Sequence, residues 1–167
     1  MTEVKYYNVK NQIIKIDRYA YDDNGNVTAE WEVNGQGTLQ GGVRHYELDG
    51  NNRITCQYCT NLSGKRVNLT GLEYCEVRNV YDDRGNVKEK TFFDVNGKPA
   101  IDEQKTYKRF YRYDDRNNEI YEKNIGKDGK PIHGNDVNPE AKVEYDDHNN
   151  MTVLECYDGN GQRYICT

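Results

Sequence analysis

Short runs of alternating apolar and polar residues, separated by turn sequences, extend along most of the chain. Val27, Ala29, Trp31 and Val33 alternate with Thr28, Glu30 and Glu32. Side chains that alternate in this way are typical of half-buried β-strands, because successive side chains point to opposite faces. No long window has the period of an α-helix, and the best helical candidate, residues 139–142, is one turn at most. The pattern therefore predicts strands joined by turns.

A segment that begins with Tyr-Asp-Asp recurs along the chain. Copies begin at Tyr81, Tyr113 and Tyr145, so successive copies are 32 residues apart. An earlier copy begins at Tyr21, and a degenerate copy begins at Glu47. A second turn signal follows each copy, with its glycine at Gly35, Gly64, Gly97, Gly129 and Gly161. Asn-Gly and Asp-Gly between patterned runs favour β-hairpins, so the turn signals predict about eleven strands.

The predicted fold is all-β: an elongated antiparallel meander of β-hairpin repeats with a period of about 32 residues and essentially no helix. The sheet is expected to be a single layer, or to curl through strand twist. Residues 1–167 are interpreted as one repeat domain. Residues 1–20 form capping strands, and the copies start near residues 21, 47, 81, 113 and 145. Each repeat would be stabilised by stacking on the next.

The composition explains how such a chain manages with little aliphatic core. Leu, Ile, Val and Phe account for only 31 of 167 residues, whereas Asn, Asp and Gly account for 50 and Tyr for 15. Turn residues belong to the hairpins, and tyrosine rings can cover a thin sheet. The net charge of −5 argues against general nucleic-acid binding. No run is apolar and long enough to span a membrane, and the N-terminus has no signal-peptide pattern, so the sequence as written predicts a cytoplasmic protein. A fragment of an exported protein would instead lie outside the cell or on its surface.

The repeated motif suggests a family. The pattern Tyr-x-Tyr-Asp-Asp-Arg at residues 111–116 and the segment at residues 19–26 resemble bacterial YD repeats of the RHS class. The aromatic strands followed by Asn-Gly-Lys turns are also similar to cell-wall-binding and MORN-type hairpin repeats. The resemblance covers residues 19–167 and implies a β-sheet wrap. It departs from the YD pattern where Asn117 and Asn149 replace glycine.

The cysteines offer a candidate for metal or redox chemistry. Cys56 and Cys59 form a CxxC pair, and Cys75 with His45 could complete a zinc site if the fold brought them together. A redox pair would need a helix N-terminus, whereas here the pair lies in a predicted strand. A structural role is favoured, with zinc and redox chemistry as alternatives. All five cysteines, including Cys156 and Cys166, are expected to be reduced, since their spacing does not suggest a disulfide framework.

The paired aspartates are candidates for acid–base or calcium chemistry. They lie at residues 82–83, 114–115 and 146–147. Neighbouring residues of a strand point to opposite faces, and an active site is rarely repeated. Residues 22–26 and 158–162 lack the ligand spacing of a calcium loop, so turn chemistry is favoured. We therefore expect a non-enzymatic protein with no catalytic residue, cofactor or metal.

An aromatic ladder is the best candidate binding surface. Its members are Tyr19, Tyr21, Trp31, Tyr81, Phe93, Tyr111, Tyr113 and Tyr145. Tyrosine is favoured in binding surfaces, and its ring can stack on sugars. The predicted function is a protein-interaction or structural repeat module that presents this face. The alternatives are a glycan- or cell-wall-binding module and a ladder that serves only as core. The predicted partner is a protein or a glycan, and an open sheet edge could also support self-association.

Overall fold

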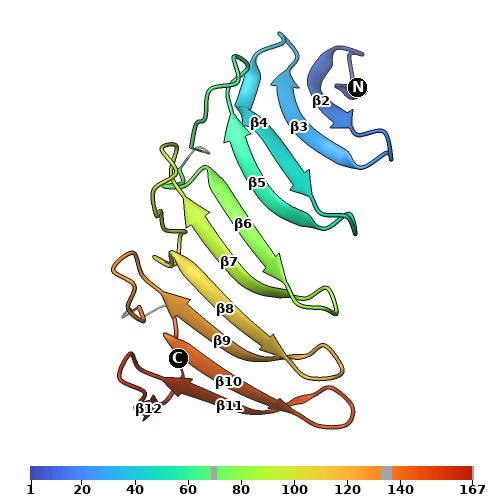
Figure 1. Cartoon of the computed structure of the whole chain (residues 1–167). Helices are drawn as coiled ribbons and strands as arrows, with labels where there is room; N and C mark the ends of the chain where they lie inside the picture. The colour runs from blue at the N-terminus through green and yellow to red at the C-terminus, as the bar shows by residue number, and fades with distance from the viewer. Residues whose placement is uncertain (69–70, 133–136, 167) are drawn as a thin grey trace. The chain divides into compact units, whose positions relative to one another are not determined.

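The computed structural model describes residues 1–68, 71–132 and 137–166. Within these residues the chain forms twelve β-strands and no helix, in one antiparallel sheet whose strand order follows the chain (Figure 1). The strands are Thr2–Tyr7 (β1), Ile13–Tyr21 (β2), Val27–Asn34 (β3), Leu39–Leu48 (β4), Ile54–Thr60 (β5), Glu76–Tyr81 (β6), Val87–Phe93 (β7), Lys108–Tyr113 (β8), Glu119–Ile125 (β9), Glu140–Tyr145 (β10), Met151–Tyr157 (β11) and Arg163–Tyr164 (β12). The all-β meander expected from the sequence is confirmed.

One local prediction needs correction. Residues 139–142, the best helical candidate, instead lead into β10, where Ala141 and Lys142 pair with Glu122 and Tyr121 of β9. Pairing with a neighbouring strand overrides a weak local helical signal. The turn between β1 and β2 contains neither an Asn-Gly nor an Asp-Gly pair. That turn, Asn8–Gln12, takes its positive φ at Asn11 rather than at a glycine.

The chain divides into two compact units, which are described separately. Unit 1 comprises residues 1–77 and 94–96, and unit 2 comprises residues 78–93 and 97–167. The first repeat turn, at Tyr21, lies in unit 1, whereas the turns that follow Tyr81, Tyr113 and Tyr145 lie in unit 2. Among the described residues, no helix is long and apolar enough to cross a membrane.

Every repeat turn has the same five-residue loop. In the loop Asp114–Asn118, the N–H of Asp114 donates to the carbonyl of Asn118, and the N–H of Asn117 donates to the carbonyl of Asp114. Asn117 has a φ of 65°, a conformation that glycine and asparagine adopt at low cost. The same loop position is filled by Gly25, Asn52, Gly85 and Asn149, all with positive φ. The Asn-for-Gly replacements in the motif are therefore compatible with the turn.

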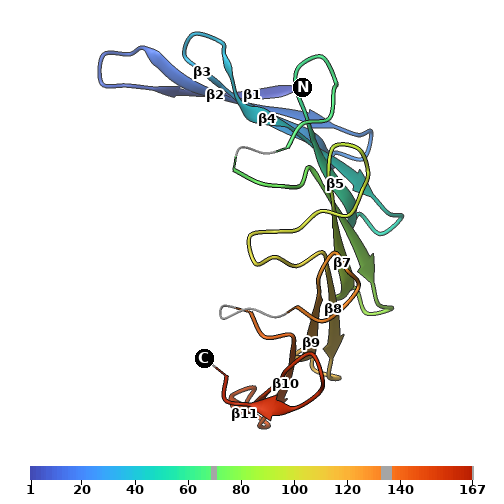
Figure 2. The ribbon, with the colours of Figure 1, turned by 90° about the vertical axis from the view of Figure 1, so that its left-hand side faces the viewer.

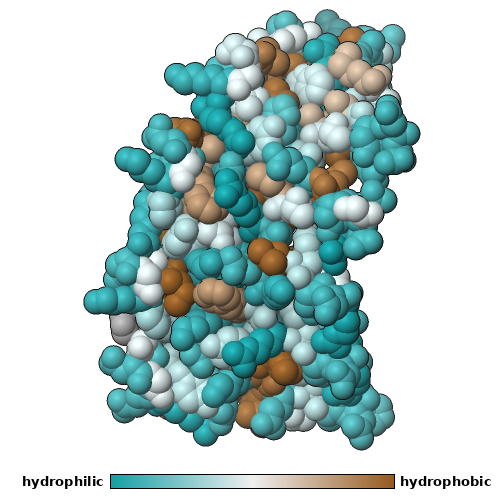
Figure 3. Space-filling view, in the orientation of Figure 1, coloured by the Kyte–Doolittle hydropathy of each residue, from teal (hydrophilic) through white to brown (hydrophobic). Residues whose placement is uncertain are grey.

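The buried core is small in both units and contains polar residues. In unit 1 the buried side chains are Ala29, Val33, Val43, Cys56, Cys59, Thr60, Cys75 and Glu76. In unit 2 they are Thr91, Phe92, Ala100, Asp102, Thr106, Asn124, Ile132, Ala141 and Cys156. In the view of Figure 3, hydrophobic residues form small separate patches among hydrophilic ones. The scarcity of aliphatic residues in the sequence thus corresponds to a thin core.

One face of unit 2 is covered by the connections between its strands. Asp102 of the connection after β7 forms an ion pair with Arg109 of β8. Asn124 of β9 donates its amide to the carbonyl of Asn138 in the connection before β10. Figure 2 shows the connections after β7 and β9 on the same side of the strands. We call the side that carries Arg109 and Asn124 the covered face of unit 2, and the other side the open face.

Cys156 of β11 and Cys166 form a disulfide, with Cα atoms 5.5 Å apart. The expectation that all five cysteines are reduced is therefore wrong for this pair. The two residues are only ten positions apart, and the turn between β11 and β12 brings them together. The sequence spacing could not show that this turn folds the chain back on β11.

Removing this disulfide is expected to free the segment around β12. Closing a loop of this length stabilises by roughly 2–3 kcal/mol in the chain-entropy model. Because β12 lies at the end of the strand order, hydrogen exchange in Cys156→Ser with Cys166→Ser should quicken in residues 156–166 and stay unchanged in β8. Thiol titration of the denatured wild-type protein should find three free thiols, Cys56, Cys59 and Cys75. Five free thiols would contradict the assignment.

Candidate functional site

The first aspartate of each repeat motif is bound by its own loop. Asp114 Oδ1 accepts the N–H groups of Arg116 and Asn118 at 2.9 Å, and Oδ2 accepts the Asn118 amide at 2.9 Å. These hydrogen bonds, led by that of the Asn118 side chain, lower the pKa of Asp114. Asp22, Asp49 and Asp146 are bound in the same way. The turn chemistry predicted for these residues is confirmed.

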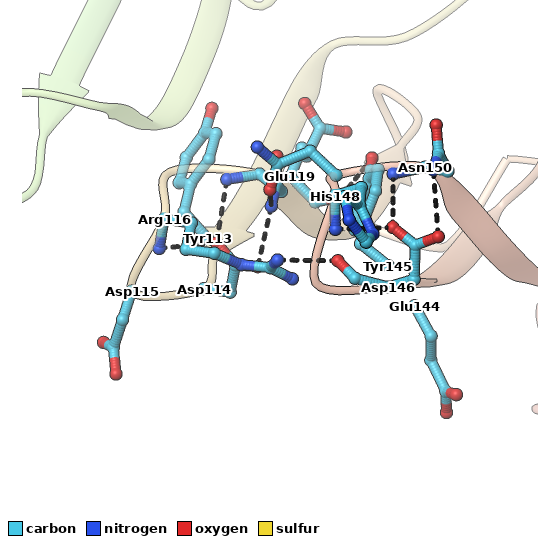
Figure 4. A network of polar contacts seen from close by, with 12 residues as sticks. Tyr113, Asp114, Asp115, Arg116, Glu119, Glu144, Tyr145, Asp146, His148 and Asn150 are labelled. Atoms are coloured by element: carbon cyan, nitrogen blue, oxygen red, sulfur yellow. Dashed lines mark hydrogen bonds and ion pairs between the residues drawn. The ribbon is translucent and has the colours of Figure 1, made fainter.

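The second aspartate of the motif points away from the first. Figure 4 shows Asp115 directed away from the loop network that holds Asp114. The Asp115 side chain is fully exposed, and its Oδ1 lies 3.8 Å from Arg84 Nη1. The two carboxylates therefore do not face a common point, as the alternation of side chains predicted.

Asparagine side chains link each repeat turn to the next within a unit. The Asn86 amide donates to Asn117 Oδ1 at 3.0 Å, and the Asn118 amide donates to Asn149 Oδ1 at 2.9 Å. In unit 1, the Asn26 amide donates to Asn52 Oδ1 at 3.0 Å. Each acceptor is the positive-φ residue of its loop. Asparagine at this position therefore supplies an acceptor that glycine lacks, and we call these contacts the amide links.

Backbone carbonyls extend the connection between turns. Arg116 Nη1 donates to the carbonyl of Asp146 at 2.6 Å (Figure 4), and Arg84 Nη2 donates to the carbonyl of Tyr113 at 3.2 Å. His148 occupies the same motif position in the last copy. The residue that follows the paired aspartates thus also reaches the next repeat.

The motif tyrosines serve the same purpose. Tyr113 donates its hydroxyl to the carbonyl of Val87, and Tyr145 donates to that of Glu119, each one repeat earlier in the chain. Burial, followed by the charge of Glu119, raises the pKa of Tyr113 to about 12. These hydroxyls are engaged inside the array, which supports the structural reading of this part of the ladder.

The other ladder residues do not form one surface. Tyr19 pairs with Glu30, whereas Trp31 pairs with Arg18, so the register places the Tyr19 and Trp31 side chains on opposite faces of the sheet. Tyr21 is 42% exposed at the end of β2. Phe93 meets Tyr107 edge-to-face at 6.0 Å, with Arg78 over its ring.

Tyr81 and Tyr111 complete the set. Tyr81 is half-buried at the end of β6. Tyr111 is half-buried on β8 opposite Glu122, and burial raises the pKa of its hydroxyl. The register places Tyr111 on the covered face of unit 2, with Arg109 and Asn124. The structure therefore distributes the eight predicted residues between units and faces, and their binding role stays a prediction.

The cysteines and His45 of the alternative zinc reading are buried or stacked in unit 1. His45 stacks on Tyr58 with centroids 4.8 Å apart, and its Nε2 lies 2.9 Å from Thr60 Oγ1. Burial raises the pKa of Cys59 and of Cys75, so both favour the neutral thiol. Among the residues that the structure describes, no group of three His, Cys, Asp or Glu side chains is arranged to hold a metal.

Acidification is expected to destabilise unit 1 through His45. Burial, followed by the charge of Arg66, lowers the pKa of His45. The stabilisation that neutral His45 contributes should therefore be fully present above its pKa in the unfolded state, about 6.5. It should decrease as the pH falls towards the lower pKa of the folded state. Melting curves at pH 8 and pH 5 should show a smaller loss for His45→Gln than for wild type. A His148→Gln control that removes as much of the pH dependence would contradict this.

The open face of unit 2 carries three aromatic rings that the predicted ladder did not include. Phe110, Tyr121 and Tyr157 lie on it, and consecutive strand pairs align Phe110 with Lys123 and Tyr157 with Glu140. A continuous row runs across five strands: Glu89, Phe110, Lys123, Glu140 and Tyr157. Two aromatic rings and three charged side chains therefore lie side by side in this row.

A cation lies over each of these rings. Lys108 Nζ is 5.1 Å from the Phe110 centroid, and the Arg112 guanidinium is 4.7 Å from that of Tyr121. Lys142 Nζ is 4.4 Å from the centroid of Tyr157. Carboxylates complete the face, with Lys108 bound to Glu89 at 2.6 Å. The pairs hold both the rings and the charges in defined positions.

A shallow hollow opens beside this row. It has a volume of about 550 Å³ and is lined by Lys88, Glu89, Phe110, Tyr111, Arg112, Tyr121 and Lys123. The sequence contained the signal for this face, because Lys108, Phe110 and Arg112 alternate with the Tyr residues of β8. The sequence did not indicate which face of the sheet the connections between the strands cover.

No protein-family model matches the sequence, and no curated protein matches it. Forty chains of solved structures match this structure. One is from a TcdB2-TccC3 structure, with 15% identity and a TM-score of 0.48, and one is from TcdB2-TccC3-Cdc42, with 14% and 0.49. A third is from the Photorhabdus luminescens Tc holotoxin pore, with 15% and 0.48.

Each of these three matches covers 97% of this chain but only 9–10% of the other chain. With TM-scores below 0.5, these similarities do not support a family or a function. The antiparallel meander and its repeated loops define the molecule instead. The chain is a β-hairpin repeat protein in which asparagine amides connect the repeats within each unit and tyrosine hydroxyls also connect them in unit 2.

Proposed function

We propose that this chain is a non-enzymatic protein-interaction module whose binding surface is the open face of unit 2. The supporting observation is the set of three rings on this face, Phe110, Tyr121 and Tyr157, each with a Lys or Arg over it. Phe, Tyr and Arg are enriched at the centres of protein interfaces, where a few aromatic and arginine side chains contribute most of the affinity.

The charge of this face indicates an acidic partner. Its cations are Lys108, Arg112, Lys123, Lys142 and Arg163, and its carboxylates are Glu89, Glu140, Glu144 and Glu155. Cations therefore exceed carboxylates by one on this face, although the whole chain has a net charge of −5. Such a local excess attracts a partner of opposite charge and favours one orientation of docking.

The repeated polar residues support a non-enzymatic role. The first motif aspartates are bound by their own loops, and the Tyr113 and Tyr145 hydroxyls are bound to neighbouring carbonyls. These residues act in the turns and between the repeats, which leaves the open face as the surface for recognition. The proposal involves no cofactor.

Binding should be lost when the rings of the open face are removed. Phe110→Ala with Tyr121→Ala is expected to weaken capture of a specific partner by roughly 30-fold or more, since central aromatic residues contribute about 2 kcal/mol or more. Wild-type and variant proteins would be immobilised in equal amounts, and captured proteins quantified by mass spectrometry from extracts of the native source. Circular dichroism would establish that the variant folds.

Charge reversal provides a second test that keeps the rings. Lys123→Glu with Lys142→Glu should weaken binding, whereas Lys5→Glu with Lys10→Glu makes the same change of net charge on exposed residues of unit 1 and should not. The affected partner should be an acidic protein whose binding decreases with salt. If every captured protein binds all variants equally, the open face is not the interface.

A further inference from the structure

A break in the pairing of β3 and β4 creates a hollow in unit 1. Glu30 pairs with Arg44 and Glu32 pairs with Gln40, so Trp31 alone faces three residues of β4, 41–43. Gly41 has a φ of +77°, and a Cβ on Gly42 would lie 3.2 Å from the carbonyl oxygen of Thr60. Two glycines therefore allow β4 to bulge here, as bulges beside binding sites often do.

The hollow has a volume of about 350 Å³ and spans three strands. Its lining residues are Asp17, Arg18, Tyr19, Glu30, Trp31, Glu32, Gln40, Gly41, Gly42 and Arg44. This volume lies at the lower end of the range for small-molecule sites, about 300–1,000 Å³. All of these residues belong to unit 1.

The strand register explains the shape of the hollow. Asp17, Glu32 and Gln40 form one row of side chains, and Tyr19, Glu30 and Arg44 form another row on the same face. Between the rows, Arg18 and Trp31 direct their side chains to the opposite face, and Gly41 and Gly42 have none. The hollow thus has a backbone floor between two polar walls.

Every charged side chain of the two walls takes part in an ion pair. Lys15 Nζ lies 3.2 Å from Asp17 and 2.7 Å from Glu32. Glu30 Oε1 accepts Arg44 Nη1 and the Tyr46 hydroxyl, both at 2.7 Å. Asp17 and Glu32 share one lysine, so a single negative charge is left over, which is too little to select a highly charged ligand. A ligand that offers several neutral hydrogen-bonding groups would fit better.

Two further features suit such a ligand. Arg44 Nε is buried without a hydrogen-bond partner and belongs to the wall of the hollow. Carboxylates accept hydrogen bonds from hydroxyl groups, and the ring of Tyr19 offers an apolar face beside them. We propose that this hollow binds a neutral polyhydroxylated ligand, namely a sugar unit of a glycan.

The proposal can be tested by calorimetric titration of the full chain with three neutral sugars, cellotetraose, tetra-N-acetylchitotetraose and maltotetraose. At least one should bind saturably below about 10 mM, the range of weak single-site binding.

Substitutions test whether the sugar binds in the hollow. Tyr19→Ala and Glu32→Gln should each weaken it by about tenfold, the effect of one lost hydrogen bond or ring contact. Tyr7→Ala removes an exposed tyrosine of unit 1 that does not line the hollow, and this variant should bind as wild type does. The proposal is overturned if none of the three sugars binds, or if Tyr19→Ala and Glu32→Gln both bind with unchanged affinity. Saturable binding of spermidine without binding of any sugar would also overturn it, in favour of a cation site.

Discussion

Replacing Phe92 with alanine is expected to lower the free energy of unfolding of unit 2 by about 3–5 kcal/mol. Phe92 of β7 is 5% exposed and is the only phenylalanine among the buried side chains that the structure describes. Its carbonyl accepts the N–H of the buried Ala100, so the ring lies where the connection after β7 meets the sheet. In a core this thin, few other side chains could fill the cavity.

The neighbouring residue provides the control. Phe93→Ala removes a ring of the same size from a partly exposed position, where it contacts Tyr107 and Arg78. Denaturant titrations should show a clearly larger change for Phe92→Ala than for Phe93→Ala. Equal changes would mean that the small core does not support unit 2.

Removing two amide links should also have a large effect. Asn86→Ala with Asn118→Ala breaks the links to Asn117 and Asn149 together with the bonds to Asp82 and Asp114. At about 1 kcal/mol for each asparagine, a loss of roughly 2 kcal/mol is expected in unit 2, measured by denaturant unfolding. Breaking contacts between repeats should also reduce cooperativity, which would lower the m-value.

A matched variant separates the amide links from the turns. Asn96→Ala changes an asparagine of a loop that belongs to the second set of turns, in which its N–H donates to Asp94 Oδ1. The backbone N–H survives that substitution, and Asn160→Ala makes the same change in unit 2, where the N–H of Asn160 donates to Asp158 Oδ1. A change below about 0.5 kcal/mol is expected for each of these two variants. An effect as large as that of the double variant would mean that asparagine acts through local turn propensity.

The sequence predicted the architecture because its signals are local. Alternation and the turn motif at Tyr113 or Tyr145 depend on neighbouring residues, and both the strands and the loops formed as expected. In the sequence alone, Asn117 is a departure from the glycine of the motif. Only the structure shows that Asn117 accepts a hydrogen bond from Asn86, 31 residues earlier.

The candidate sites were harder to predict because they depend on contacts distant in sequence. Alternation separated Phe110 from Tyr111, but the choice of the open face depends on where Asp102 and Asn138 cover the sheet. The Cys156–Cys166 disulfide likewise depends on how the chain turns after β11. The hollow beside Tyr19 arises from a register shift in β4 that its Gly41-Gly42 sequence allows but does not specify.

The most direct test of the repeat architecture is the coupling free energy between Asn118 and Asn149. Unfolding would be measured for wild type, Asn118→Ala, Asn149→Ala and the double variant. The control is the pair Asn86 and Asn149, which belong to repeat turns that are not adjacent. We predict a coupling of about 0.5–1.5 kcal/mol for Asn118 with Asn149 and a value near zero for the control. A coupling near zero for both pairs would contradict the conclusion that asparagine amides join the repeats.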